Sequence, residues 1–575
     1  MLAGATGMDV VMLVVAADDS VKQQTREHLE ILRLLNLAAG VIVLTKCDLV
    51  EADWLELVEA EVRDFVAGTF LADAPIIRTS TVTGAGLDRL REQLAAAAAR
   101  AVDAGRLRRV DAPFRMAIDR TFTMTGYGTV VTGSVSSGRT RVGDELVIEP
   151  GDVAVRVRGL QNHDRAVEEV HRGQRAAVNL AGIHHDETLR GQELASPGHL
   201  VPSRLLTSWL SLLPSAPRPL KSRTRLRVHL GTAELMASVS LLDRERLEPG
   251  QAGPVQLFLK APAVAVWSQP LVVRSESPVT TIGGGTVLDP TAAKLRRPDE
   301  ATLQMIADLR SPAPLQRAAA ALFFAGLRPW QPGDLLRAAG VENGAEVCQQ
   351  LSARSELREI PLSPTRTVRI HHQVLDGLAQ RVEATLRKMH AQHPLRSHFD
   401  RAVLAAAFRY LDDEALLDFV LTDLARSGRI QWSDRGLALA GCGPKLSVNE
   451  RRLLAELIAG FRAAGLASPS IEQCQRQAAR NREAVPQLIA LAVADGELVE
   501  VAAGYYLHRD VDQQVRASLR DRLADGKGAT VSDIREWLNT TRKYAVPYCE
   551  YLDRSGFTHR AGDLRYLAET PAIPR

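Results

Sequence analysis

The sequence contains 575 residues, of which 46% are hydrophobic and 24% charged, and its formal net charge is +3. These values are typical of globular proteins and exclude a fibrous or largely disordered chain. A chain of this length predicts several domains, because a single hydrophobic core stops growing well below it. The small net charge means that any nucleic-acid surface must be local.

The five cysteines stand far apart without a C-x-x-C pair, so the sequence predicts neither a zinc site nor a disulfide framework. No apolar run approaches the length of a membrane span, and the first residues do not resemble a secretory signal. We therefore expect a cytoplasmic monomer with no membrane partner and no bound metal ion.

The first region, residues 1–105, alternates apolar strands with helical segments. Residues 8–17 and 40–45 are unbroken apolar runs rich in Val, which is typical of strands buried on both faces of a parallel sheet. A third strand is expected near residues 75–80. The alternation predicts a doubly wound α/β domain.

The pattern then changes twice along the chain. Short strands with Gly-containing turns predict two β-barrel domains, over residues 112–200 and 218–297. The remainder is mostly helical, and four of its segments end alike in a helix, a short strand, a turn and a second strand. Helices followed by a two-stranded wing form the winged-helix arrangement. We expect four such units, over residues 298–372, 373–443, 444–509 and 510–575.

The motif T-K-C-D follows the second apolar strand. A carboxylate at a strand end can accept two hydrogen bonds from N1–H and the exocyclic amine of guanine, and adenine lacks that amine. Asp48 would thereby select GTP over ATP, while Lys46 lays its stem along the base and Thr45 stands where Asn is usual. Ser80 and the Thr81 N–H are expected at the same sheet edge, near guanine O6. Alone, the motif has a high chance rate, and a strand followed by a capped helix is the alternative.

Three segments carry a family resemblance. Residues 23–50 closely resemble the guanine-binding half of translational GTPases of the elongation factor Tu type. Residues 113–146 resemble the second domain of these proteins in the version found in the SelB group, the selenocysteine-specific elongation factors. The winged-helix-like tail, most clearly at residues 540–567, is similar to the C-terminal extension of that group. The resemblance implies a GTP-dependent carrier that brings selenocysteinyl-tRNA to the ribosome at UGA codons marked by an mRNA hairpin.

The front of the α/β domain departs from the family pattern. Family members begin with G-x-x-x-x-G-K-[ST], a switch segment and D-x-x-G, which hold the phosphates and Mg²⁺, and these segments are not found at the start of this sequence. We therefore expect an incomplete P-loop-GTPase-like domain in a chain that is N-terminally incomplete. GTP or GDP is the expected nucleotide, and Mg²⁺ is expected for the full-length family, with its ligands missing here.

Catalysis is consequently left open at this stage. The resemblance implies GTP hydrolysis on the ribosome, with a switch-region His that positions water. None of the 14 histidines stands in a motif that supports this role. No catalytic residue is therefore assigned, and hydrolysis by this chain alone is not predicted.

The resemblance also places a selenocysteinyl pocket on Asp119, Arg120 and Arg190. A selenol is more acidic than a thiol, so a selenocysteinyl group should be anionic at neutral pH where a seryl group is neutral. Guanidinium groups could separate the two by charge. From the residues alone, Asp119 and Arg120 would instead indicate a turn or a surface ion pair.

The last unit carries a candidate RNA-binding surface. Arg542, Lys543 and Tyr544 fall at the start of the expected recognition helix, and Arg560 and Arg565 fall in the wing. Such groups can contact phosphates and stack on unpaired bases, although a solvated helix face would show the same residues. The resemblance implies that this end grips the mRNA hairpin.

Two other functions fit parts of the pattern. An ordinary GTPase carrier or nucleotide-transfer subunit would share the α/β domain and the barrels but would have no use for the tail. A non-enzymatic RNA- or DNA-binding protein could carry the winged helices beside a degenerate GTPase domain.

Overall fold

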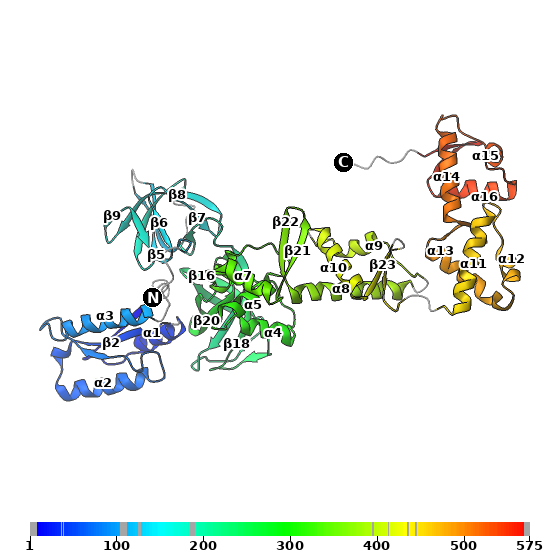
Figure 1. Cartoon of the computed structure of the whole chain (residues 1–575). Coiled ribbons are helices and arrows are strands. Elements are labelled where there is room, and N and C mark those ends of the chain that lie inside the picture. Colours follow the sequence, from blue (N-terminus) through cyan, green and yellow to red (C-terminus); the bar gives the residue numbers. More distant parts are fainter. Residues whose placement is uncertain are drawn as a thin grey trace. The chain divides into compact units, whose positions relative to one another are not determined.

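The computed structural model describes residues 8–35, 37, 39–103, 112–124, 128–183, 190–393, 396–411, 413–433, 436–442 and 446–568 (Figure 1). The chain forms two compact units, Met1–Glu359 with Arg369–Val374 and Ile360–Val368 with Leu375–Arg575. Within the described residues, no helix has the length and apolar character needed to span a membrane.

The first domain is a three-stranded parallel sheet in the order β1-β2-β3. Its elements are β1 (Val10–Ala16), α1 (Gln23–Leu34), β2 (Ala39–Thr45), the 3-10 turn η2 (Cys47–Leu49), α2 (Ala52–Val66), β3 (Ile76–Arg78) and α3 (Leu87–Asp103). The central strand β2 is buried on both faces, because Ile42 packs with α1 and α2 while Val41 packs with Ala97 of α3. Helices α2 and α3 accordingly lie on opposite sides of the sheet (Figure 1).

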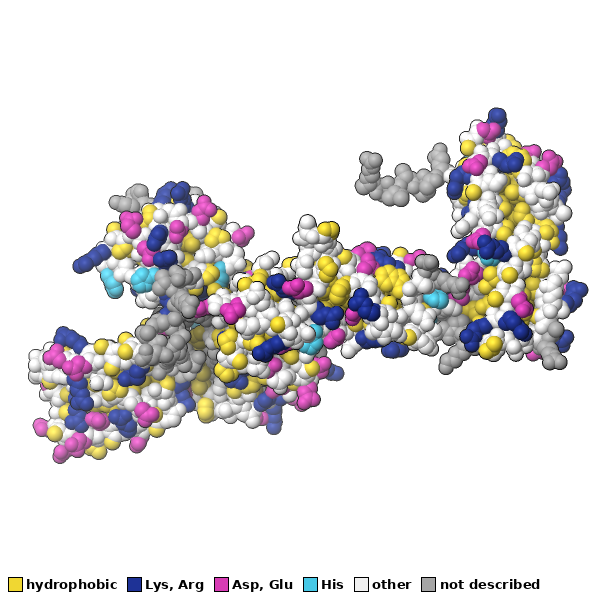
Figure 2. Space-filling view, in the orientation of Figure 1, with side chains coloured by type: hydrophobic (Ala, Val, Ile, Leu, Met, Phe, Trp, Pro, Cys, Tyr) yellow, Lys and Arg dark blue, Asp and Glu magenta, His cyan; other side chains and the backbone are white. Residues whose placement is uncertain are grey.

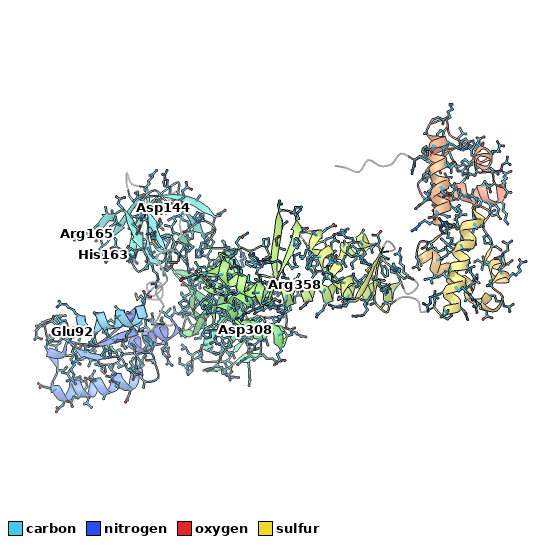
Figure 3. All side chains as sticks on the ribbon, in the orientation of Figure 1. Glu92, Asp144, His163, Arg165, Asp308 and Arg358 are labelled. Atoms are coloured by element: carbon cyan, nitrogen blue, oxygen red, sulfur yellow. The ribbon has the colours of Figure 1, made fainter. Side chains whose placement is uncertain are left out.

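The first barrel is closed by one additional strand pairing. Its strands are β4 (Arg115–Met124), β5 (Gly128–Ser137), β6 (Arg139–Arg141), β7 (Glu145–Glu149), β8 (Val153–Asn162), β9 (Arg165–Val167), β10 (Glu169–His171), β11 (Arg175–Ala181) and β12 (Glu193–Ala195). Seven of these strands pair in the order β11-β5-β4-β12-β7-β8-β9, and β11 also pairs with β8. The other two, β6 and β10, pair with each other. The β8–β9 hairpin, where Figure 3 labels His163 and Arg165, turns through His163 and Asp164 at φ 49° and 59°.

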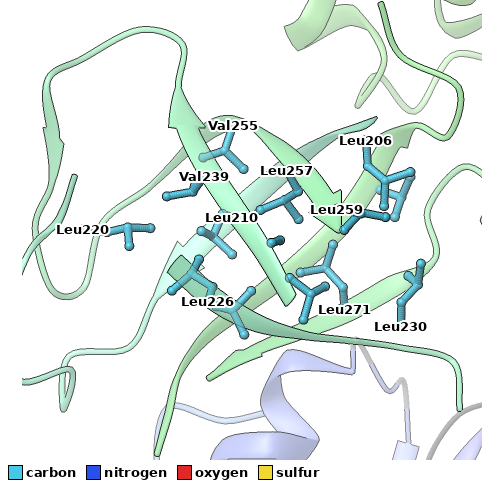
Figure 4. Close-up of a cluster of buried hydrophobic side chains, with 14 of the residues drawn as sticks. Leu206, Leu210, Leu220, Leu226, Leu230, Val239, Val255, Leu257, Leu259 and Leu271 are labelled. Atoms are coloured by element: carbon cyan, nitrogen blue, oxygen red, sulfur yellow. The ribbon is translucent and has the colours of Figure 1, made fainter. Parts of the chain in front are cut away.

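The second barrel is closed in the strand order β13-β18-β16-β15-β19-β20. Its strands are β13 (Ser203–Leu212), β15 (Arg225–Leu230), β16 (Ala233–Leu241), β18 (Ala252–Ala263), β19 (Pro270–Ser275) and β20 (Thr281–Asp289), and β14 (Leu220–Lys221) pairs with β17 (Arg246–Leu247) in a separate two-stranded sheet. Leu210, Leu257 and Leu271 fill its centre (Figure 4). Gly285 lets two strands approach closely, because a Cβ there would lie 1.8 Å from the Trp209 carbonyl oxygen.

The first winged-helix unit shares a core with the second barrel. It consists of α4 (Glu300–Asp308), α5 (Pro314–Ala325), α6 (Asp334–Ala339), α7 (Gly344–Ala353) and the wing β21 (Leu357–Ser363) with β22 (Arg366–His371). Leu242 and Leu288 of the barrel side lie in one apolar cluster with Ile306 and Leu322 of the helices. The helices of this unit are therefore packed against the barrel rather than joined to it only by a linker.

The remaining helices and wings form three further units. The second unit consists of α8 (His372–Gln392), α9 (Arg401–Ala405), η4 (Ala406–Phe408), α10 (Glu414–Arg426) and the wing β23 (Ile430–Ser433) with β24 (Gly436–Leu439). The third consists of α11 (Val448–Ala464), α12 (Ile471–Gln477), η5 (Ala479–Ala484), α13 (Val485–Ala494) and the wing β25 (Leu498–Ala502) with β26 (Tyr505–His508). The fourth consists of α14 (Arg509–Leu523), α15 (Val531–Trp537), α16 (Arg542–Arg554) and the wing β27 (Thr558–Ala561) with β28 (Leu564–Leu567). Val501 and Leu507 of the third wing pack in one core with Leu519 and Tyr548 of the fourth unit.

The predicted combination of an α/β domain, two β-barrels and a winged-helix tail is confirmed. Local signals fix several helix starts in the tail, because the side chains of Ser447, Ser470 and Thr530 accept hydrogen bonds from the third residue of the helix that follows. The predicted limits of the individual domains stay predictions.

Candidate functional site

The T-K-C-D motif lies at the carboxyl edge of the parallel sheet. Strand β2 ends at Thr45, and Lys46 turns the chain with φ 59° before η2 exposes Asp48. The Lys46 ammonium does not stand free: its Nζ lies 2.8 Å from Asp18 Oδ2 and 3.1 Å from Oδ1. The hydrogen bond to Asp18, which follows β1, raises the pKa of Lys46.

The segment after β3 is fixed to the same edge by backbone hydrogen bonds. Thr79 N–H donates to the Leu44 carbonyl at 2.8 Å, and Cys47 N–H donates to the Thr79 carbonyl at 3.2 Å. Ser80 is buried, and its Oγ accepts from Thr83 N–H at 3.1 Å. Thr81 is exposed. The structure therefore brings both predicted segments to one sheet edge, while the Ser80 hydroxyl is already engaged within its own turn.

A second charged site lies on the first barrel. Asp119 of β4 accepts two hydrogen bonds from Arg175 of β11, from Nη1 to Oδ2 at 2.6 Å and from Nη2 to Oδ1 at 3.0 Å. Thr132 of β5 donates a third, from Oγ1 to Oδ1 at 2.9 Å. The Asp119 carboxylate raises the pKa of Arg175. Asp119 therefore lies in a strand rather than a turn, and its ion pair is formed across strands with the half-exposed Arg175.

The other two residues of the predicted pocket are exposed. Arg120 lies on β4 opposite Thr132 in the strand register, next to the Asp119–Arg175 pair. Arg190 precedes β12, and among the described residues it makes no hydrogen bond or ion pair with Asp119 or Arg120. Its charge instead contributes to lowering the pKa of His229 on the second barrel. Sequence reasoning missed Arg175, since only the β4-β5-β11 register brings it to Asp119.

The predicted RNA-binding residues of the last unit fall into different environments. Arg542 and Lys543 are exposed at the start of α16, and Arg560 is exposed in the wing. Tyr544 is half-buried, with its ring centroid 5.5 Å from that of Tyr505 in the third unit. Figure 2 shows basic and acidic side chains interspersed over the visible face rather than gathered in one field.

Arg565 differs from the other four predicted residues. Its side chain is only 3% exposed, and its Nε lies 2.8 Å from Asp553 Oδ2. Its backbone also bridges to Ala529, which holds the wing against the segment before α15. The prediction that Arg565 contacts RNA is therefore corrected, because its guanidinium is buried in an ion pair with Asp553.

The described residues were also considered as metal ligands. Among them, no group of three or more His, Cys, Asp or Glu side chains is placed to hold a metal ion. The carboxylates at the sheet edge, Asp18 and Asp48, fit contacts to a lysine and to a base, respectively.

Family comparisons match successive parts of the chain. Residues 1–100 match the elongation factor Tu GTP-binding domain, and residues 128–195 match elongation factor Tu domain 2. Residues 207–294 match the β-barrel domain of selenocysteine-specific elongation factor, and residues 521–567 match a winged helix of elongation factor SelB. The expectation that the P-loop and switch region are missing is not borne out by these matches.

Whole-chain comparisons agree with these matches. The chain is 35% identical over 570 residues to the selenocysteine-specific elongation factor of Desulfomicrobium baculatum, covering 99% of this chain and 89% of that protein. It is 28% identical to the protein of the same name from Escherichia coli K12, covering 100% and 89%. The crystal structure of a bacterial selenocysteine-specific elongation factor matches its fold with a TM-score of 0.59 at 23% identity, over 99% of this chain and 88% of that one.

The parts thus occur in one order along a single chain, and both the sequence identity and the coverage extend through barrels and tail. The chain belongs to the selenocysteine-specific elongation factors.

Proposed function

We propose that this protein is a GTP-dependent carrier that delivers selenocysteinyl-tRNA to the ribosome and is recruited by an mRNA hairpin. The observation that carries the proposal is the Asp119–Arg175 pair beside the exposed Arg120 on the first barrel. A selenolate needs cationic hydrogen-bond donors when it leaves water. A guanidinium fork held in place by a carboxylate supplies these donors without the entropic cost of ordering a free side chain.

In this proposal, residues at the carboxyl edge of the parallel sheet select GTP over ATP. Asp48 accepts the N1–H and amine hydrogens of guanine, and Lys46, held by Asp18, packs its stem against the base. Adenine would leave the Asp48 carboxylate unpaired. Hydrolysis of GTP on the ribosome is part of the proposal, with no catalytic residue assigned in this chain.

In the same proposal, the winged-helix tail recognises the mRNA hairpin. Arg542 and Lys543 are exposed at the start of α16, where they can reach phosphates of a stem-loop. Arg560 extends this surface into the wing. Two RNA contacts, one for the tRNA and one for the hairpin, would then lie on different domains of the same chain.

The decisive experiment compares selenocysteinyl-tRNA with seryl-tRNA on the same tRNA body, in the presence of GTP. Binding is measured as protection of the aminoacyl ester from spontaneous hydrolysis. We expect protection of the selenocysteinyl ester only, and its loss in Arg120→Ala with Arg175→Ala. Equal protection of both esters would refute selection by charge.

A second measurement tests the nucleotide site independently. Fluorescent GTP should bind the wild type, and the preference for GTP over ATP should disappear in Asp48→Asn. If neither nucleotide binds and the tail alone holds a stem-loop, the non-enzymatic RNA-binding alternative is the better description.

A further inference from the structure

A group of cationic side chains on the outer face of the second barrel has donors without acceptors. Arg227 of β15 lies directly opposite Arg274 of β19 in the strand register, and His229 follows on the same face of β15. Arg227 Nε, Arg274 Nε and His229 Nε2 are all buried atoms without a hydrogen-bond partner. Buried donors are rarely left unpaired in folded proteins, so the two arginine Nε–H groups indicate a missing acceptor.

Like charges aligned across two strands add to the same conclusion. Two arginines directly opposite each other repel, and such a pair destabilises a sheet. Among the described residues, Glu234, which lies opposite His229, is the carboxylate that pairs with the group: its Oε1 lies 2.7 Å from Arg227 Nη1. Arg274 Nη2 donates to the Val279 carbonyl at 3.2 Å, and Arg274 shares the negative charge of Glu234 with Arg227.

The electrostatic surroundings of His229 report the same excess of positive charge. Burial lowers the pKa of His229; the Glu234 carboxylate raises it, and Arg274, Arg227 and Arg190 lower it. The group formed by Arg227, His229 and Arg274 thus keeps unpaired donors and, with Glu234 as its carboxylate partner among the described residues, an excess of positive charge. A water molecule could supply only the acceptors.

We propose that Arg227, His229 and Arg274 form a binding site for a phosphate group. A phosphate offers several acceptor oxygens around one centre and carries negative charge that offsets the excess positive charge of the group. This chemistry comes either from the backbone of a bound RNA or from a free phosphate ion. The RNA source rests on the proposed function, whereas the anion site itself does not.

The test uses the full chain and the double variant Arg227→Gln with Arg274→Gln. The matched control is Arg244→Gln with Arg246→Gln, which removes two arginines that pair with Asp243 and Glu248 elsewhere on the same barrel. Inorganic phosphate is titrated at constant ionic strength, with chloride as the balancing anion. We expect phosphate to raise the melting temperature of the wild type and the control, and the double variant to bind at least about tenfold more weakly.

A tRNA arm separates the two sources. If the site holds RNA, the slope of log affinity for tRNA against log salt concentration should fall by about 1 in the double variant and stay unchanged in the control. A loss of phosphate binding with an unchanged tRNA slope would assign the site to a free anion. The site is refuted if phosphate affects the wild type and the double variant equally. A protein that binds phosphate but no tRNA at all would contradict the carrier function while leaving the anion site intact.

Discussion

Arg175 and Asp119 are joined by two hydrogen bonds although 56 residues separate them in the sequence, and Nη1 lies 2.6 Å from Oδ2 while Nη2 lies 3.0 Å from Oδ1. This is the geometry of a planar fork on a carboxylate, which a lysine cannot reproduce. The pair fixes one guanidinium in the proposed selenocysteinyl pocket.

Arg175→Lys should therefore keep the charge and lose the orientation. We expect the preference for selenocysteinyl-tRNA over seryl-tRNA to fall by about tenfold, as measured by ester protection. Stability should change by less than about 1 kcal/mol, because the arginine side chain is half exposed. Arg165→Lys, on the exposed β8–β9 hairpin of the same barrel, is the control and should change neither quantity.

Asp18→Asn tests whether Lys46 is positioned by its ion pair. Removing the charge of Asp18 should weaken GTP binding by about threefold, the range of an exposed ion pair, while the preference for GTP over ATP stays with Asp48. The matched control is Asp19→Asn, since Asp19 pairs with Lys22 instead, at 2.8 Å. An altered base preference in Asp18→Asn would contradict this division of roles.

Arg565→Ala should act on folding rather than directly on RNA contact. Its loss leaves Asp553 next to a buried gap, and breaking a buried ion pair costs about 3 kcal/mol. Chemical denaturation should show this loss in the last unit. By contrast, Arg542→Ala with Lys543→Ala should lower stem-loop affinity and change stability by less than about 0.5 kcal/mol. A stable Arg565→Ala protein with reduced RNA affinity would overturn the correction made for this residue.

His371 should make the first winged-helix unit sensitive to acid. Burial, assisted by the neighbouring His372, lowers the pKa of His371 to about 4 from 6.5. The unfolded chain therefore binds a proton first, and stability is lost as the pH falls from 6.5 towards 4. Between pH 7 and pH 5 the loss should be about 2 kcal/mol.

The measurement is denaturant unfolding at both pH values. The pH dependence should flatten in His371→Asn, whatever the absolute stability of that variant, and persist in His163→Gln, where the histidine is exposed on the β8–β9 hairpin. An unchanged pH slope in His371→Asn would assign the acid sensitivity to another group.

The elements of this chain were largely predictable from local patterns. The apolar run that forms β2 is continuous because that strand is buried on both faces, whereas Met12 and Val14 leave one face of β1 exposed, against the expectation for that run. The wings were recognisable because each follows a helix end, and three of the four helix ends carry a Gly in the turn, Gly428, Gly496 and Gly556. The nucleotide prediction was also local, because it rested on the position of Asp48 directly after a strand.

The pairings between distant residues were not predictable. Asp119 meets Arg175 through the register of three strands and an irregularity between Ile118 and Arg120. Arg565 is buried because its backbone pairs with Ala529, a contact between segments with no shared pattern. Sequence periodicity reports which face a residue occupies, whereas partner identity depends on how strands are aligned.

The common core of the second barrel and the first winged-helix unit changes how the chain can be divided. Leu242 and Leu288 pack against Ile306 and Leu322. A protein truncated after Asp289 would therefore expose this apolar side of the barrel to solvent. The smallest block that keeps this core buried therefore contains the barrel together with α4 to α7, as far as Leu357.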